Sequence, residues 1–460
     1  MRRAALALTL TLLGAALGQP LPAPAWGDSV YPQLGQAGLD VTHYDVTLRV
    51  ARPGTRTLQG EVTLTVRAVK ALPLLSLDYL GAAVTGVTWD GGAVPHERTP
   101  EKLLVRRPLA AGQTARVTVR FDGVTGEVPD PSLPGALGWQ AVPGPGGGVN
   151  FAYSEPDGTR AFLPVNDHPA DPATFTLRVT VPPGVTAAAS GVQTGVQPVV
   201  GGRTFTFEQR QPIPPYALAL HLGSLERVDQ SAVVSGGKQV ALRDYFPPGI
   251  PPAVRAPYAR TGEILRVLGE WFGPYPFETY GSVVVTPPLP ALETATLSTM
   301  PVTSSSVRVI VHEAAHQWFG NSVVLGDWAD TWLNEGFATY AELVWAQSQG
   351  EDGQAMVQGW YARLQARGTR PLVARAADDL FDGSAYARGA LALHAVRVTV
   401  GDAAFKSFLH IYVRQQAGQP TRTADLLRLV RAQLGQPAEA VLRRWIESPA
   451  LPPLPGLQTP

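Results

Sequence analysis

The spacing of the hydrophobic residues changes once along the chain, near residue 230, and this change constrains the fold more than any other feature. Between about residue 40 and residue 228, apolar and polar residues alternate in short runs, which are separated by turns rich in glycine and proline. Successive side chains of a β-strand point to opposite faces, so a period of two is typical of strands that bury one face. Short strands joined by tight turns indicate an antiparallel sheet. The clearest alternating runs are residues 44–50, 62–66, 117–121, 175–181 and 216–222.

From about residue 253 onward, the apolar residues recur at helical spacing instead, for example in residues 264–272, 391–396 and 426–430. Within this second half, residues 281–286 are predicted to form a further strand. The sequence therefore predicts an α+β protein, in which an N-terminal antiparallel β-sheet domain is followed by a mainly helical domain. We place the two domains at residues 40–228 and 229–449, after a linker at 19–39 and before a proline-rich, extended tail at 450–460.

The first eighteen residues are typical of an export signal. Arg2 and Arg3 precede an apolar run at residues 4–13, and small residues at 16–18 form a cleavage site before Gln19. The run is much shorter than the roughly 20 residues of a membrane-spanning helix, so we favour cleavage over an uncleaved anchor. We therefore expect residues 1–18 to be a signal peptide, the protein to be exported to the periplasm or the medium, and no membrane attachment after cleavage.

Composition excludes several classes of partner and chemistry. Apolar residues make up 45% of the 460 residues and charged residues 16%, which is typical of a globular protein. The formal net charge is zero and no long basic run occurs, so we do not expect binding to nucleic acid. The chain has no cysteine, which excludes disulfides and thiol catalysis.

The motif that indicates chemistry is His312-Glu313-Ala314-Ala315-His316. Two histidines four residues apart project from one face of a helix, and both imidazoles can then reach one metal ion. Glu313 lies beside His312 and can reach a water on that ion. This is the H-E-x-x-H pattern of zinc peptidases. Three serines at 304–306 offer N-caps for the helix, and Gly320 offers a stop. The alternative is a helix with two solvated histidines.

A catalytic zinc takes a third protein ligand and keeps one position open. Glu335 is a candidate, because it lies near the start of a second predicted helix whose apolar stripe includes Leu333 and Phe337 and whose cap is Asp330. Taken alone, Glu335 is better explained as a first-turn glutamate that favours the helix dipole.

The pattern H-E-x-x-H, then eighteen residues, then Glu335 within N-E-G-F-A resembles the M1 family of zinc aminopeptidases, which are gluzincins. Three further segments are similar to motifs of this family and occur in its order. Residues 290–294 (P-A-L-E-T) stand in place of the G-A-M-E-N exopeptidase segment, and residues 386–390 (Y-A-R-G-A) resemble its Y-E-K-G-A. Residues 155–160 and 164–169 resemble the end of its N-terminal domain. Arg388 replaces the usual lysine, and only two residues of G-A-M-E-N are kept.

The resemblance implies a saddle-like β domain and a thermolysin-like catalytic domain, in a short two-domain form without the C-terminal helical domain of many members. It also implies one Zn²⁺ per chain, held by His312, His316 and Glu335. Zinc would polarise the amide carbonyl and lower the pKa of a bound water. Glu313 would accept the water's proton and deliver it to the leaving amine, and Tyr386 would stabilise the oxyanion.

The resemblance further implies that Glu293 and Glu155, with Ala291 beside them, bind the free N-terminal ammonium of a peptide substrate. Taken alone, each glutamate is better explained as a solvated loop residue, and Tyr386 as an ordinary half-buried helix tyrosine. Because Glu155 belongs to the sheet domain, we expect the active site between the two domains. The oligomeric state is not predicted.

Two other functions stay open. A thermolysin-like endopeptidase shares the histidines and the distal glutamate, although an acidic pair for an amine and a β-rich upstream domain argue against it. A non-catalytic module could bind zinc structurally, although such a site needs no base at Glu313. The remaining histidines are isolated, and we interpret them as structural: His43, His96, His168, His221, His394 and His410.

Overall fold

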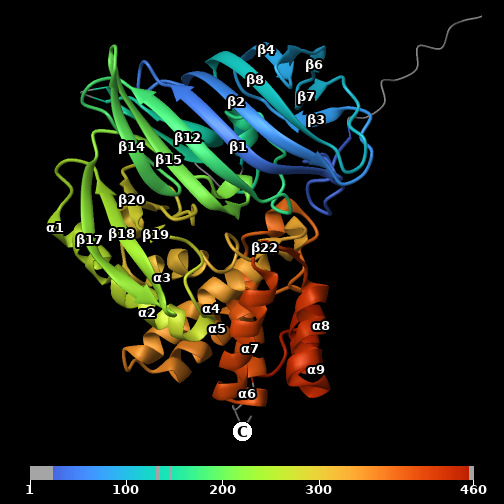
Figure 1. Ribbon diagram of the computed structural model, residues 1–460. Coiled ribbons are helices and arrows are strands. Elements are labelled where there is room, and N and C mark those ends of the chain that lie inside the picture. The colour runs from blue at the N-terminus through green and yellow to red at the C-terminus, as the bar shows by residue number, and fades with distance from the viewer. Residues whose placement is uncertain (1–23, 131–134, 145–146, 455–460) are drawn as a thin grey trace, which may run out of the picture.

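The computed structural model describes residues 24–130, 135–144 and 147–454 (Figure 1). The predicted signal peptide at residues 1–18 lies outside these ranges. The large sheet lies across the top of the view in Figure 1, and the helices of the C-terminal half gather below it. The predicted order, a sheet domain and then a helical domain, is confirmed.

The large sheet has eight strands in the order β14-β15-β12-β1-β2-β8-β4-β5. Buried and exposed residues alternate along its long strands, as the period of two predicts. Each pair of neighbours is antiparallel except β1 and β12, which run parallel, with Val46 opposite Leu177. The strands are β1 (Leu39–Arg49), β2 (Thr57–Ala68), β4 (Ala83–Trp89), β5 (Gly92–Ala93), β8 (Thr114–Val124), β12 (Ala173–Val181), β14 (Val192–Val199) and β15 (Gly202–Ile213).

Two smaller sheets share one hydrophobic core with the large sheet. The first orders its strands β3-β7-β6 and the second β13-β16-β11-β10-β9. Their bounds are β3 (Leu75–Asp78), β6 (His96–Arg98), β7 (Lys102–Val105), β9 (Val128–Pro129), β10 (Ala136–Val142), β11 (Val149–Tyr153), β13 (Thr186–Ala189) and β16 (Leu220–Gly223), with the 3-10 turns η1 (Thr159–Ala161) and η2 (Pro215–Ala217).

A fourth sheet, ordered β17-β18-β20-β21 with β19 on β18, opens the C-terminal half. The predicted boundary at residue 228 falls inside β17, and the sheet pairing breaks earlier, between β16 and β17. Partly buried and exposed residues still alternate over residues 227–231 of β17, so the hydrophobic period alone could not locate this break. The strands are β17 (Glu226–Ser235), β18 (Lys238–Phe246), β19 (Thr279–Tyr280), β20 (Ser282–Val285) and β21 (Ser298–Pro301); β22 (Val324–Leu325) pairs with β23 (Pro420–Thr421).

The helices surround α4, which is buried along most of its length. A Cβ on Gly336 of α4 would lie 2.9 Å from the Cα of Gly389 in α6, so these two glycines let the helices touch. The helices are α1 (Pro252–Arg255), α2 (Thr261–Phe272), α3 (Val307–Ala315), α4 (Trp332–Ser348), α5 (Gly353–Arg367), α6 (Gly389–Val400), α7 (Asp402–Gln416), α8 (Thr423–Leu434) and α9 (Gln436–Glu447). Shorter turns are η3 (Ala256–Arg260), η4 (Val302–Ser304), η5 (Trp328–Asp330), η6 (Ala377–Asp379) and the π turn η7 (Ser384–Arg388).

The predicted linker is packed where the structure describes it, from residue 24 onward. The buried Asp28 accepts hydrogen bonds from the backbone N–H of Trp328 at 2.7 Å and of Tyr31 at 2.8 Å, and its Oδ2 lies 3.0 Å from Nε2 of His168. This segment therefore ties the sheet domain to the helical domain. At the other end, residues 449–454 form no helix, as the prolines predict. None of the described helices combines the length and the apolar character needed to cross a bilayer.

Candidate active site

Helix α3 presents the two histidines of the H-E-x-x-H motif on one face. Ser306 caps the helix, because its Oγ accepts a hydrogen bond from the N–H of Val309 at 3.3 Å. The helix ends at Ala315, before the predicted stop at Gly320. His316 nevertheless keeps helical dihedral angles as the C-cap residue, and its ring centroid lies 4.8 Å from that of His312.

Glu335, in the first turn of α4, meets both histidines. Its Oε2 lies 3.2 Å from Nε2 of His312 and 3.6 Å from Nε2 of His316. Asp330 does not cap this helix as predicted, since Thr331 takes that position. Its carboxylate instead accepts a hydrogen bond from Oγ1 of Thr423 at 2.5 Å.

The Nδ1 atom of each imidazole, which faces away from Glu335, has a hydrogen-bond acceptor. Nδ1 of His312 donates to Oε1 of Glu342 at 3.0 Å, and Nδ1 of His316 donates to the backbone oxygen of Phe319 at 3.1 Å. With both protons held at Nδ1, the Nε2 lone pairs face Glu335 and are available to a metal. Our sequence analysis missed Glu342, although it follows Glu335 by seven residues, two helical turns along the same face.

These three donors fit a catalytic zinc site. Zinc bonds of about 2.0–2.2 Å in a tetrahedron place neighbouring donor atoms roughly 3.4 Å apart, close to the distances from Glu335 to the two histidines. The ligand atoms of His312, His316 and Glu335 all lie within 4.8 Å of one another. A set of two histidines and one glutamate leaves the fourth position for a reactant.

Glu313 lies next to this cluster and is buried. A carboxylate oxygen of Glu313, one of Glu293 and a ring nitrogen of His316 also lie within 4.8 Å of one another. Burial raises the pKa of Glu313 to about 7, although the two neighbouring histidines act to lower it. A carboxyl group with this pKa can both accept and release a proton near neutral pH.

Glu293 and Glu155 reach the cluster from different parts of the chain. Glu293 follows β20, where its backbone oxygen accepts a hydrogen bond from Nδ2 of Asn321 at 2.7 Å, and Glu155 follows β11 in the sheet domain. The two carboxyl groups share a hydrogen bond. Burial raises the pKa of both, and the negative charge of Glu293 raises that of Glu155 further. Within the described residues, Oε1 of each is buried without a hydrogen-bond partner.

Tyr386 lies on the π turn η7, just before the close contact of α6 with α4. Its ring stacks on that of His312, with centroids 5.9 Å apart. Burial, reinforced by the surrounding glutamates, raises the pKa of Tyr386 well above its ordinary value, so its hydroxyl keeps its proton and can donate it in a hydrogen bond. Arg388 points elsewhere: it is buried and donates to the backbone oxygens of Trp445 at 2.8 Å and Arg370 at 2.7 Å.

One cavity of about 470 Å³ brings the predicted site residues together. It lies where the sheet domain, through Glu155, meets α3, α4 and η7 of the helical domain. Its lining comprises Glu155, Pro290, Ala291, Glu293, Ser304, Ser306, Arg308, Val309, His312, Glu313, His316, Glu335, Glu342 and Tyr386. The six isolated histidines do not line it. Among them, His168 is more than the predicted turn residue, because it stacks on Trp26 and pairs with Asp28.

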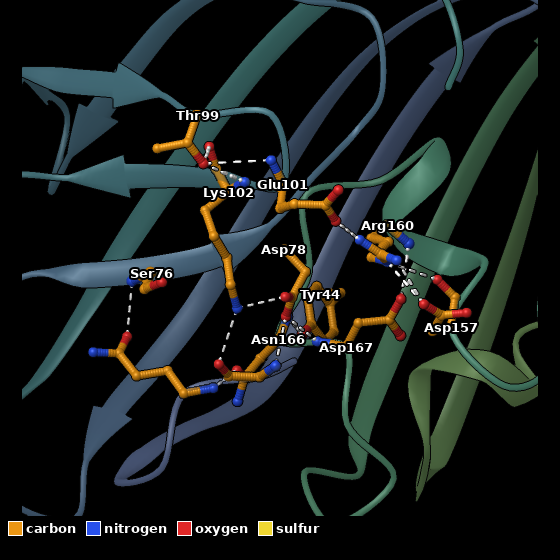
Figure 2. A network of polar contacts seen from close by, with 12 residues as sticks. Tyr44, Ser76, Asp78, Thr99, Glu101, Lys102, Asp157, Arg160, Asn166 and Asp167 are labelled. Atoms are coloured by element: carbon orange, nitrogen blue, oxygen red, sulfur yellow. Dashed lines mark hydrogen bonds and ion pairs between the residues drawn. The ribbon is translucent and has the colours of Figure 1, made fainter. Parts of the chain in front are cut away.

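A buried polar network holds the segment that follows Glu155 (Figure 2). Arg160 donates to the Asp157 carboxylate at 2.7 Å and forms an ion pair with Glu101. Oδ2 of Asp78 accepts the backbone N–H of Asp167 at 2.9 Å, and Oδ1 accepts from Nζ of Lys102 at 2.5 Å. These contacts hold both ends of the segment against the small sheet β3-β7-β6.

The sequence and the fold also match those of known proteins. The model of the peptidase M1 N-terminal domain matches residues 41–217, and that of the peptidase family M1 domain matches residues 259–445. A mutant M1 zinc metallopeptidase from Deinococcus radiodurans, solved with a Tyr-Ser-Ala substrate, is 52% identical, with a TM-score of 0.90 over 94% of this chain and 99% of that chain. A two-domain M1 zinc metallopeptidase mutant bound to L-tryptophan is also 52% identical, with a TM-score of 0.91 over 94% of this chain and 100% of that chain.

Aminopeptidase N of Streptomyces lividans is a curated relative, 30% identical over 328 residues. These residues are 64% of this chain, but the match spans only 37% of that protein. The solved structures, in contrast, match over almost their whole length, with the same two-part architecture. The chain therefore belongs to the M1 family of zinc metallopeptidases.

Proposed function

We propose that this protein is a zinc-dependent aminopeptidase, which removes N-terminal residues from peptides. The observation that carries the proposal is the buried pair of Glu155 and Glu293 beside the metal donors. Each has a buried carboxylate oxygen that no described residue satisfies. Burial of two adjacent carboxylates is costly unless a shared proton or a cation joins them, and a peptide's N-terminal ammonium is a cation of the right size with three donors.

The other residues take roles that amide hydrolysis requires. His312, His316 and Glu335 would hold one zinc per chain. When bound, zinc supplies Lewis acidity towards the carbonyl oxygen and lowers the pKa of water. Glu313, a buried carboxyl group, would take a proton from the attacking water and pass it to the leaving amine. The Tyr386 hydroxyl would donate a hydrogen bond to the oxyanion.

The substrate class follows from the same arrangement. Anchoring the ammonium at Glu155 and Glu293 places the first peptide bond, and no later one, near the metal donors. The Deinococcus relative was solved with a Tyr-Ser-Ala substrate, which supports peptide substrates for this chain as well. An endopeptidase does not bind a free N-terminal ammonium and so does not need a buried anionic pair at this position. A structural zinc site does not need a buried carboxyl group such as Glu313.

The test compares one peptide with its N-acetylated twin, with zinc content measured on the same protein sample. We expect cleavage of the free peptide from its N-terminus, no cleavage of the acetylated one, and about one zinc per chain. Equal cleavage of both peptides would exclude the aminopeptidase and favour the endopeptidase. Zinc without cleavage of either peptide would favour the binding module.

We also propose that the protein is exported with cleavage after residue 18. The proposal depends on the sequence of residues 1–18, in which Arg2 and Arg3 precede an apolar run and small residues end it. Mass spectrometry of protein recovered from the native cells or their medium tests it. We expect a mature N-terminus at Gln19, whereas an intact N-terminus in the cytoplasmic fraction would refute export.

A further inference from the structure

We propose that Arg308 binds the C-terminal carboxylate of short peptide substrates, so that the enzyme prefers peptides of about three or four residues with a free C-terminus. This inference rests on the proposed aminopeptidase function and adds a second substrate contact to it.

Several residues that line the cavity lie along helix α3. Residues 308, 312 and 316 are spaced four apart and therefore follow one face of the helix. With a rise of 1.5 Å per residue, residue 308 lies about 12 Å along the helix axis from residue 316. Glu293 has a carboxylate oxygen within 4.8 Å of a His316 ring nitrogen. The ammonium site therefore lies at the His316 end of the cavity, and Arg308 lies at the opposite end.

The charges that line the cavity differ between its two ends. The glutamates of the cavity gather around the two histidines, whereas Arg308 is the sole arginine or lysine in the described lining. Ser304 and Ser306 line the cavity with it and add hydroxyl groups. A guanidinium binds a carboxylate through two parallel hydrogen bonds, so this end fits an anionic group.

The spacing of residues 308 and 316 along α3 matches a short peptide. An extended chain spans about 3.3–3.6 Å per residue, so about 12 Å corresponds to three or four residues. A peptide of this length that binds Glu155 and Glu293 through its ammonium would place its C-terminal carboxylate near Arg308. A longer peptide would carry its carboxylate beyond that point.

Arg308 is free to change partners. Its side chain is 48% exposed, and its guanidinium pairs with Glu351 at 3.1 Å, which is itself 52% exposed. An ion pair this exposed contributes little to stability. The carboxylate of a substrate can therefore replace Glu351 at small cost.

The experiment measures kcat/KM for Ala-Ala-Ala and for its C-terminal amide, and expresses the result as the ratio of acid to amide. We expect a wild-type ratio on the order of ten, the size of one charge-assisted contact. The ratio should fall to about one in Arg308→Gln and lie between these values in Arg308→Lys, which keeps the charge without the paired donors. With Ala-Ala-Ala-Ala-Ala-Ala and its amide, the wild-type ratio should already be near one.

Arg120→Gln is the matched control. Arg120 lies on β8 in the large sheet, is 53% exposed and pairs with Glu61 at 2.5 Å. It is therefore similar to Arg308 in exposure and in having one acidic partner, but it does not line the cavity. Its variant should keep the wild-type ratio. A wild-type ratio near one, or an unchanged ratio in Arg308→Gln, would overturn the inference while leaving the aminopeptidase intact. Failure of the wild type to cleave either tripeptide would refute the proposed function itself.

Discussion

Replacement of Lys102 by methionine tests how the sheet domain holds the substrate-binding segment. The side chains of Lys102 and Asp78 are 4% and 0% exposed, and their charged atoms lie 2.5 Å apart (Figure 2). Nζ of Lys102 also donates to the backbone oxygen of Gly35 at 3.1 Å. Methionine has a similar volume and no charge, so Lys102→Met leaves the Asp78 carboxylate buried without its counter-charge.

The expected cost follows from these contacts. Two charges 2.5 Å apart attract by about 6–7 kcal/mol at an effective dielectric constant of about 20. Part of this attraction is offset, because Oδ2 of Asp78 still accepts the N–H groups of Gly35 and Asp167, each at 2.9 Å. Removing one partner of a buried pair typically lowers the free energy of unfolding by about 3–5 kcal/mol. Because two donors still stabilise the Asp78 carboxylate, we expect the lower part of this range, about 3–4 kcal/mol.

The assay is thermal unfolding at pH 7, followed by tryptophan fluorescence. A loss of about 3–4 kcal/mol should lower Tm by roughly 6–16 °C for a domain of this size. The control is the double variant Asp78→Asn and Lys102→Met, which removes both charges. Its amide oxygen can still accept both N–H groups, so the double variant should be more stable than Lys102→Met alone.

Lys102→Met should also weaken substrate binding at the active site. Asp78 holds the N–H of Asp167, at the end of the segment that begins at Glu155. We therefore expect KM to rise in Lys102→Met and to recover in the double variant. The reasoning would be refuted if Lys102→Met lost less than about 1 kcal/mol, or if the double variant were less stable than the single one.

Four further predictions concern single residues. Glu313→Gln should lower kcat at least about a hundredfold at unchanged zinc content, and full turnover would exclude it as the base. Tyr386→Phe should lower kcat by about a hundredfold or more with little change in KM, so an effect on KM alone would argue against contact with the oxyanion. Glu342→Gln should weaken zinc binding about 10- to 100-fold, because it removes the carboxylate that accepts the His312 Nδ1 proton. A chelator competition measures this, and an unchanged zinc affinity would contradict the role of Glu342. Burial raises the pKa of Asp244 from 3.8 to about 7, so its neutral form favours the fold at low pH and this contribution is lost as pH rises from about 4 to 7. The Tm of wild type minus that of Asp244→Asn should therefore fall over this range, and a constant difference would refute the shift.

The sequence by itself determined the features that depend on neighbouring residues. The period of two predicted strands β1, β2, β8 and β12 of the large sheet, because side chains alternate between faces whatever the strand later pairs with. The spacing of His312 and His316 predicted a shared helix face for the same local reason. Motif resemblance brought in Glu335, Glu293, Glu155 and Tyr386, whose spacing alone favoured ordinary structural roles.

Only the tertiary structure decided how distant segments meet. It paired β1 with β12 in parallel, placed β17 across the predicted boundary, and packed Asp28 between His168 of the sheet domain and Trp328 of the helical domain. It also brought Glu342 to Nδ1 of His312, and Arg308 into the lining of the cavity that Glu293 also lines. These relations join residues that are far apart in the chain, so they depend on packing and on burial of polar groups, which no local periodicity encodes.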